Sequence, residues 1–175
     1  MANLKEIKRR IGSVKKTRQI TSAMKLVATA KLRRAKDAAL AAKPYQEQLA
    51  ELLTRVAGKV GDDSENPLLA SRDDVRKRLL VVITSDRGLC GPFNNGLLRK
   101  TGEFVSSNGA CDVIAIGKKA RNFMQSNDIN MIDTIVDYSK TPKMEMVMPL
   151  CETLVAGFVD GTYDEVYVVY NQFVN

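Results

Sequence analysis

Residues 4–32, LKEIKRRIGSVKKTRQITSAMKLVATAKL, begin a helical pattern that continues to residue 60 and decides the first part of the fold. Alternating steps of three and four from Leu4 visit seventeen positions, and thirteen of these are apolar. A 3.5-residue period is typical of a helix that packs lengthwise on another helix. We therefore predict that residues 1–60 form half of a coiled coil. Its apolar side, here called the seam, includes Leu4, Ile7, Ile11, Val14, Leu32, Leu49, Leu53 and Val56.

The remainder of the sequence has no second helical pattern of comparable length. We therefore expect another protein, or a further segment of this one, to cover the seam. Within the helix, Gly12 is tolerated at a cost of about 1 kcal/mol. Pro44 lacks a backbone donor, and we expect it to kink or interrupt the helix near residues 41–43.

Positive charge is concentrated in the same helix. Residues 1–60 carry 15 Lys and Arg against 4 acidic residues, a net charge of +11, whereas residues 61–175 carry 12 against 16, a net charge of −4. Such a helix favours an acidic partner, either nucleic acid, an anionic membrane or a carboxylate-rich protein surface. Against nucleic acid, no aromatic residue precedes Tyr45 to stack on bases, and the seam needs a helical partner. A nucleic-acid-binding module is therefore the alternative and not the preferred interpretation.

Three successive positions of the three-and-four repeat are not apolar and interrupt the seam: Arg18, Thr21 and Lys25. Around them, Met24 and its neighbours place apolar side chains on other sides of the helix. A helix with charges on its seam and apolar residues away from it is expected to be surrounded there, and not paired with one partner only.

After residue 60 the pattern changes to alternating strands and helices. Residues 61–77 include a polar, proline-terminated run that predicts a linker. From residue 78 to residue 175 we predict a Rossmann-like α/β domain with a mostly parallel sheet. We expect the methionines of its last helix to lie in the core, and the lack of a closing helix suggests truncation at the C-terminus. The expected strands are 79–84, 113–116, 131–136 and 166–170, and the expected helices are 93–107, 118–126 and 142–158.

Neither a membrane span nor a metal or disulfide framework is predicted. The sequence has no run of eighteen apolar residues. Cys90, Cys111 and Cys151 are odd in number and widely spaced, which suits neither disulfides nor zinc and favours a reducing, cytoplasmic compartment. Asp62, Asp63 and Glu65 could suggest a cation site, although a solvated turn is the preferred interpretation.

The α/β domain shows no predicted active site. The loop 85–92 lacks the glycine spacing of a dinucleotide site or a P-loop, and Ala120 replaces the Mg²⁺-binding hydroxyl after Gly117-Lys118-Lys119. The chain contains no His, which excludes schemes that use it as a base. A reactive Cys90 thiolate beside Arg87 is conceivable, but we favour a small buried residue at the strand–helix corner. We therefore predict no catalytic residue and no cofactor, and an enzyme with a nucleotide cofactor ranks third.

Three motifs carry a resemblance to a known family. Residues 20–32 (ITSAMKLVATAKL), residues 43–45 (KPY) and residues 85–91 (SDRGLCG) closely resemble gamma subunits of F-type ATP synthases. The resemblance extends over essentially the whole chain. The sequence starts at Met with no transit extension and no chloroplast-type regulatory cysteine insertion, so we expect a bacterial member.

The resemblance implies a non-catalytic rotor subunit that binds no nucleotide. It implies that the first helix pairs, antiparallel, with a C-terminal helix missing here, and that the pair turns inside a ring of three alpha and three beta subunits. The α/β domain would meet the epsilon subunit and the ring of c subunits, on the cytoplasmic side of the bacterial inner (plasma) membrane, touching the membrane only through the complex. Rotation would couple proton flow to ATP synthesis. The residues expected to contact beta subunits are Lys8, Arg9, Lys15, Lys16, Arg18, Met24 and Lys25.

Overall fold

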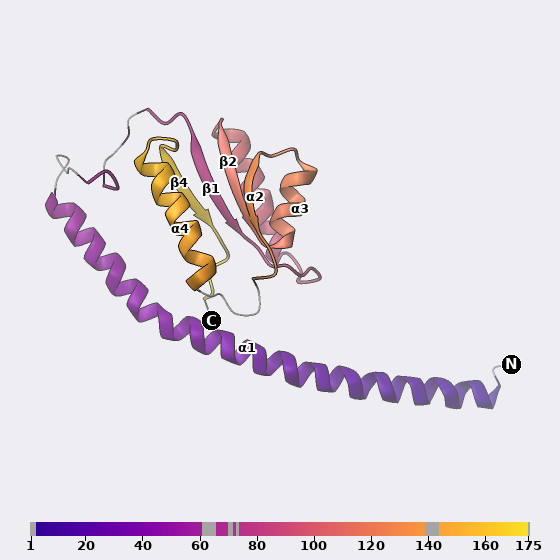
Figure 1. Ribbon diagram of the computed structural model, residues 1–175. Coiled ribbons are helices and arrows are strands. Elements are labelled where there is room, and N and C mark those ends of the chain that lie inside the picture. The colour runs from indigo at the N-terminus through magenta and orange to yellow at the C-terminus, as the bar shows by residue number, and fades with distance from the viewer. Residues whose placement is uncertain (1–2, 61–65, 70–71, 73, 139–143, 175) are drawn as a thin grey trace. The chain divides into compact units, whose positions relative to one another are not determined.

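The computed structural model describes residues 3–60, 66–69, 72, 74–138 and 144–174 (Figure 1). It divides into two compact units, Met1–Lys59 and Val60–Asn175, each of which is described by itself. The acidic residues Asp62, Asp63 and Glu65, considered above as a cation site, lie outside the described residues.

The first unit is a single helix. Helix α1 (Leu4–Val60) is 57 residues long, which corresponds to about 85 Å. It starts at Asn3, whose side chain accepts a hydrogen bond from the Lys5 N–H at 3.2 Å, as a helix N-cap does. Glu6 and Arg10 form an ion pair one turn apart at 2.7 Å, the first of four such pairs along α1, each of which stabilises a helix by a few tenths of a kcal/mol.

The predicted interruption at Pro44 is wrong, because α1 continues through this residue without a break. Proline in a helix interior costs about 3 kcal/mol. Here the residues on both sides, AALAAK before Pro44 and QEQLAELL shortly after it, are among the strongest helix formers. Their combined preference, together with the cooperativity of helix propagation, keeps the helix intact.

The second unit is a four-stranded sheet with the strand order β3-β2-β1-β4, in which every neighbouring pair is parallel. This confirms the prediction of a Rossmann-like parallel α/β domain. All the predicted strands and helices are present, with boundaries shifted by at most a few residues. The strands are β1 (Arg78–Ile83), β2 (Cys111–Ile116), β3 (Met131–Ile135) and β4 (Glu165–Val169), and the helices are α2 (Phe93–Ser107), α3 (Lys118–Ser126) and α4 (Met144–Val159).

The sheet is covered on both faces, α2 and α3 lying on one side and α4 on the other (Figure 1). Alternate residues of the central strand β1 face the two sides: Leu80 and Val82 belong to the cluster under α2 and α3, and Leu79 and Val81 to the cluster under α4. All four are at most 2% exposed. This double burial explains why β1 is continuously apolar and does not alternate with polar residues.

Helix α4 does not place its methionines in the core, so that prediction is wrong. Met144 is 69% exposed and Met148 is 47% exposed, whereas Leu150 and Leu154 pack against the sheet. Residues four apart lie on the same side of a helix, so the two leucines form a separate stripe from Met144 and Met148. Met146 lies on the leucine side and is still 36% exposed. Glu145 and Glu152 are the only charged residues of α4, and an almost uniformly apolar helix does not indicate which side faces inward.

Candidate interaction site

The carboxyl end of β1 leads into the loop that sequence analysis considered for nucleotide binding. In the first turn of α3, the N–H of Lys118 donates to Asp86 Oδ1 at 3.0 Å, and that of Lys119 donates to the Ser85 carbonyl at 3.3 Å. The N–H of Ala120 donates to Thr84 Oγ1 at 2.8 Å. These are the groups that hold phosphate in nucleotide-binding folds. Because they already bond to the chain's own oxygens, and one acceptor is a carboxylate, a phosphate is disfavoured here.

Gly117 permits the close approach of strand ends that this arrangement requires. Its φ is +97°, and a Cβ at this position would lie 2.3 Å from the Thr84 carbonyl oxygen. The same carbonyl accepts a hydrogen bond from the Tyr138 hydroxyl at 2.6 Å. Burial raises the pKa of Tyr138, with a further contribution from Asp86. Gly117 also donates its N–H to the Ile135 carbonyl at 2.7 Å, so the ends of β1, β2 and β3 are tied together.

The side chain of Asn94 in α2, which is only 4% exposed, stabilises the loop 85–91 through hydrogen bonds. This side chain accepts a hydrogen bond from the Ser85 N–H at 3.1 Å, and donates to the Arg87 carbonyl at 3.2 Å and to Cys90 Sγ at 3.0 Å. Leu89, at the tip, has a φ of +60° and a fully exposed side chain. Sequence analysis did not identify this role of Asn94. The only indication in the sequence was that a polar residue stands at the start of a predicted helix.

The prediction that Cys90 is a small buried residue is wrong, because Cys90 is exposed. Leu89 and Gly91 on either side of it both have positive φ, which turns the chain outward at this point. Asn94 occupies the buried corner instead. All three cysteines are free thiols, and only Cys111 is buried.

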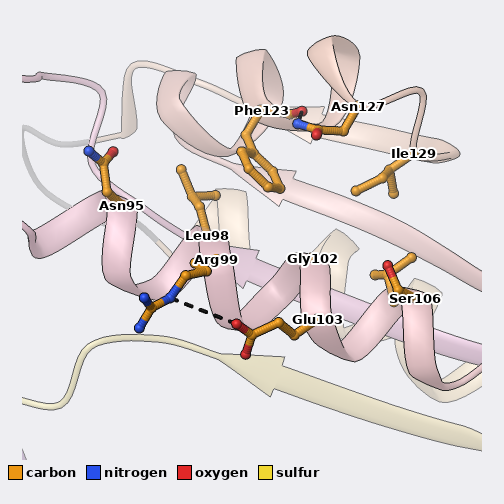
Figure 2. Close-up of a pocket in the computed structure, with 10 residues that line it drawn as sticks. Asn95, Leu98, Arg99, Gly102, Glu103, Ser106, Phe123, Asn127 and Ile129 are labelled. Atoms are coloured by element: carbon orange, nitrogen blue, oxygen red, sulfur yellow. Dashed lines mark hydrogen bonds and ion pairs between the residues drawn. The ribbon is translucent and has the colours of Figure 1, made fainter.

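A groove of about 470 Å³ lies between α2 and α3 (Figure 2). Its apolar part is formed by Leu98, Phe123 and Ile129, and its rim carries an ion pair between Arg99 and Glu103 at 3.8 Å. A Cβ on Gly102 would lie 3.4 Å from the Phe123 ring, so the ring packs close to the α2 backbone. These contacts are typical of helix packing, and the groove contains none of the residues that sequence analysis assigned to partner contacts.

Those residues all lie on α1, and each is exposed in this helix taken by itself. At 3.6 residues per turn, Lys8, Lys15, Arg18 and Lys25 fall on one side of the helix. On the same count Arg9 and Lys16 fall on a second side, and Met24 on a third. The four ion pairs within α1 use other cations. The structure therefore does not gather the predicted contacts on one surface, and a partner that met all of them would have to surround the helix.

The seam residues are also exposed in α1 taken by itself. Leu4, Val14 and Leu32 are each at least 65% exposed, and the other seam residues named above are between 41% and 57% exposed. Burying a leucine or isoleucine side chain stabilises a complex by about 1.5–3 kcal/mol, so covering the seam would be strongly favourable.

The family model described as ATP synthase matches residues 3–175. The chain belongs to the ATP synthase gamma family. An ATP synthase gamma chain of Chloroherpeton thalassium is 38% identical over 182 residues, covering 100% of this chain and 60% of the relative. One of Geobacter sp. is 42% identical over 183 residues, covering 99% and 61% respectively. The chain thus spans about three fifths of the length of these curated relatives.

Solved structures support the same fold for this ATP synthase gamma family member. The central stalk and c-ring structure of the mitochondrial ATP synthase of Tetrahymena thermophila contains a chain with a TM-score of 0.67 and 22% sequence identity. The match covers 89% of this chain and 66% of that one. In the described part of this chain, no helix has both the length and the apolar character needed to cross a bilayer.

Proposed function

We propose that this chain is a non-catalytic rotor component of an F-type ATP synthase. It would form part of the central stalk, coupling proton-driven rotation to conformational change in the catalytic beta subunits. The observation that carries the proposal is α1, with 57 continuous helical residues, an exposed seam and cations on two sides. It belongs to a chain whose match to gamma chains extends over its whole length.

The seam and the cations have separate roles in this proposal. The seam would pack against a long C-terminal helix of the kind that the family resemblance implies, which gives the shaft enough stiffness to rotate. Lys8, Arg9, Lys15 and Lys16 would meet acidic loops of the beta subunits, with Arg18, Met24 and Lys25 facing the same ring. Because these residues lie on several sides of α1, a surrounding ring satisfies them better than a single flat surface does.

The α/β unit would serve as the foot of the rotor, contacting the epsilon subunit and the ring of c subunits, while the alpha subunits complete the ring around α1. Its lack of a catalytic role is supported by the occupied N–H groups of α3 and by a sequence without His. We place the chain on the cytoplasmic side of a bacterial inner membrane, attached to it through the complex only.

Native mass spectrometry of this chain with alpha and beta subunits of a close relative tests the proposal. It is performed with and without a peptide corresponding to the C-terminal helix of the same relative's gamma chain. We expect one copy of the chain per three alpha and three beta subunits, with the peptide increasing the occupancy. No association under either condition would overturn the proposal. Binding to duplex DNA that falls steeply with salt would instead favour the nucleic-acid alternative.

A charge-reversal variant tests the assigned contacts. Replacing Lys8, Arg9, Lys15 and Lys16 by Glu should weaken assembly with the beta subunits at least tenfold, because each exposed ion pair contributes up to about 1 kcal/mol. The matched control reverses Lys31, Arg33, Arg34 and Lys36, which changes the net charge equally elsewhere on α1. Equal losses for the two variants would mean that net charge matters and the assigned positions do not.

A further inference from the structure

The chain enters the sheet through a short segment that makes several polar contacts with distant residues. This segment, here called the anchor segment, consists of Arg72 and residues 74–78. Its last residue, Arg78, is the first residue of β1. Sequence analysis treated residues up to 77 as a linker. In the structure the anchor segment is bonded to residues 158–165, which comprise the end of α4, the following turn and the first residue of β4.

Arg72 makes the outermost of these contacts. Its guanidinium donates to the Tyr163 carbonyl at 3.0 Å, to Asp164 Oδ1 at 3.2 Å and to the Phe158 carbonyl. It also lies over the Phe158 ring, 4.6 Å from the ring centroid. Phe158 is in the last turn of α4, where carbonyl groups lack helical partners and a cation is favourable. The Arg72 side chain therefore caps the C-terminal end of α4 and links it to the chain that leads into β1.

Asp164 binds the same segment from its other side. Its Oδ2 accepts hydrogen bonds from the N–H groups of Arg76 at 2.9 Å and Lys77 at 3.0 Å, and its own N–H donates to the Lys77 carbonyl at 2.9 Å. The backbone hydrogen bonds from Lys77 and Arg76 hold the pKa of Asp164 below its usual value, and Arg72 acts in the same direction. The carboxylate thus clamps two consecutive backbone groups just before β1.

A second layer links the anchor segment to the other strands. Lys77 Nζ lies 2.7 Å from Asp112 Oδ2 at the start of β2, and this oxygen also accepts a hydrogen bond from the Tyr163 hydroxyl at 2.9 Å. Asn130, just before β3, donates to Asp112 Oδ1. Arg78 pairs with Glu165 of β4 at 2.7 Å. The amino ends of all four strands are therefore connected to the anchor segment.

From these contacts we infer that the anchor segment is the point at which mechanical load from the preceding chain enters the α/β unit. Tension on the residues before Arg72 meets several charged hydrogen bonds at once, and these are stronger than neutral ones. Without them, the same tension would act directly on the hydrogen bonds of β1, which begins at Arg78. The inference rests on the proposed rotor function, since a rotor carries load between its helix and its foot.

Single-molecule force spectroscopy of the whole chain tests this inference. One handle is a ligation tag inserted at exposed Gly109, between α2 and β2. The second is attached at the N-terminus, so that the load passes through the anchor segment, or at the C-terminus, so that it bypasses the anchor segment. In the first geometry R72A should unfold at least about tenfold faster at constant force, because a lost charged hydrogen-bond cluster changes rates by this order. In the second geometry the change should be less than about twofold.

The matched control is R76A, which also removes a guanidinium from the anchor segment. The Arg76 side chain bonds to Asp74 at 2.8 Å and is largely exposed, so its loss should leave the unfolding rate unchanged in both geometries. R72K keeps the charge without the forked geometry, and should fall between R72A and the parent chain even if R72A folds poorly. Equal acceleration of R72A in both geometries, or none in either, would overturn the inference.

The force measurement uses no other subunit, so its outcome is separate from that of the assembly experiment. A chain that assembles with alpha and beta subunits, but whose R72A variant unfolds like the parent, retains the proposed function and loses this inference. A chain that does not assemble, but shows the geometry-dependent effect, retains the anchor and loses the rotor function.

Discussion

Helix α1 and strand β2 lie at opposite extremes of burial. Every residue of α1 from Leu4 to Lys59 except Gly12 is exposed, whereas all six residues of β2 are buried. The conformation of α1 depends on local backbone hydrogen bonds and helix propensity, and these contribute only modestly to stability in water. The conformation of β2 depends on neighbours from distant parts of the sequence. One unit therefore exposes its side chains, whereas the other folds around its own core.

The largest expected loss of stability comes from G117A, which alters the site where the ends of β1, β2 and β3 meet. The added Cβ would meet the Thr84 carbonyl at 2.3 Å, in a backbone conformation that L-residues avoid. We expect the α/β unit to lose at least about 3 kcal/mol of unfolding free energy. Urea titration followed by near-UV circular dichroism, which reports mostly on the tyrosines of that unit, measures this loss.

Gly109 provides the matched control, because it also has a positive φ but a Cβ added there would meet no atom within 4 Å. G109A should cost about 1 kcal/mol. The part of the far-UV signal that comes from α1 should be lost at the same urea concentration in G117A as in the parent chain. A shift of that part together with the near-UV transition would contradict the independence of the two units.

A smaller loss is expected for D112A. Asp112 is 6% exposed and binds Lys77, Tyr163 and Asn130, so removing it leaves the buried Tyr163 hydroxyl without its acceptor and breaks the ion pair with Lys77. We expect a loss of about 2–3 kcal/mol from the α/β unit. D112N retains one acceptor oxygen and should lose less. If D112N and D112A were equally destabilised, the negative charge of Asp112 would matter more than its hydrogen bonds.

The same network predicts a dependence of stability on pH. Burial acts to raise the pKa of Asp112, but the hydrogen bonds from Lys77, Tyr163 and Asn130 outweigh it and lower the pKa below its ordinary value. A carboxyl whose pKa is lower in the folded state stabilises that state above its unfolded pKa, and this contribution is lost as the pH falls through the folded value. The α/β unit should therefore weaken below about pH 4. D112N should show a shallower acid transition than the parent chain.

At the alkaline end, Tyr163 gives an optical test of the same contact. Burial, together with the hydrogen bond to Asp112 and its charge, raises the pKa of Tyr163 to about 12. Spectrophotometric titration should show a late ionisation step near pH 12 from this tyrosine. In D112N this late step should move to lower pH, and an unchanged titration would remove the hydrogen bond as a cause.

The smallest effect on unfolding is expected from the seam. I11D combined with L53D places two carboxylates on exposed positions of α1, so the unfolding free energy of the α/β unit should change by less than about 0.5 kcal/mol. Association with the alpha and beta subunits, or self-association through the seam, should fall sharply in sedimentation experiments. A loss of stability in the α/β unit would show that the seam contributes to its fold.

Much of the fold could be predicted because its signals are local. The run around Val81 and Val82 is apolar and β-branched, as a strand buried on both faces requires. The predicted bounds of α2 and α3 are confirmed. The predictions of an interruption at Pro44, of a buried Cys90 and of core methionines in α4 were wrong. Each of them depended on the balance between a local preference and the surrounding residues.

The candidate site was predictable only in part. The exposed seam and the cations of α1 follow directly from residue spacing on a helix, and their assignment to partners remains a prediction. The roles of Asp112 and Arg72 could not be foreseen. Their partners lie up to 92 residues away in the sequence, and a polar residue in a loop or at a helix start has no periodicity to mark it.

The sequence by itself therefore determined a long helix with an apolar seam, a strongly uneven charge, a parallel α/β unit and membership of a family. Only the tertiary structure decided which side of α4 faces the sheet, how the loop 85–91 is held and how the anchor segment is tied to four strands. The physical reason is that helix periodicity and strand burial follow from the pattern of neighbouring residues in the sequence. Hydrogen bonds between polar side chains depend instead on which distant segments the fold brings together.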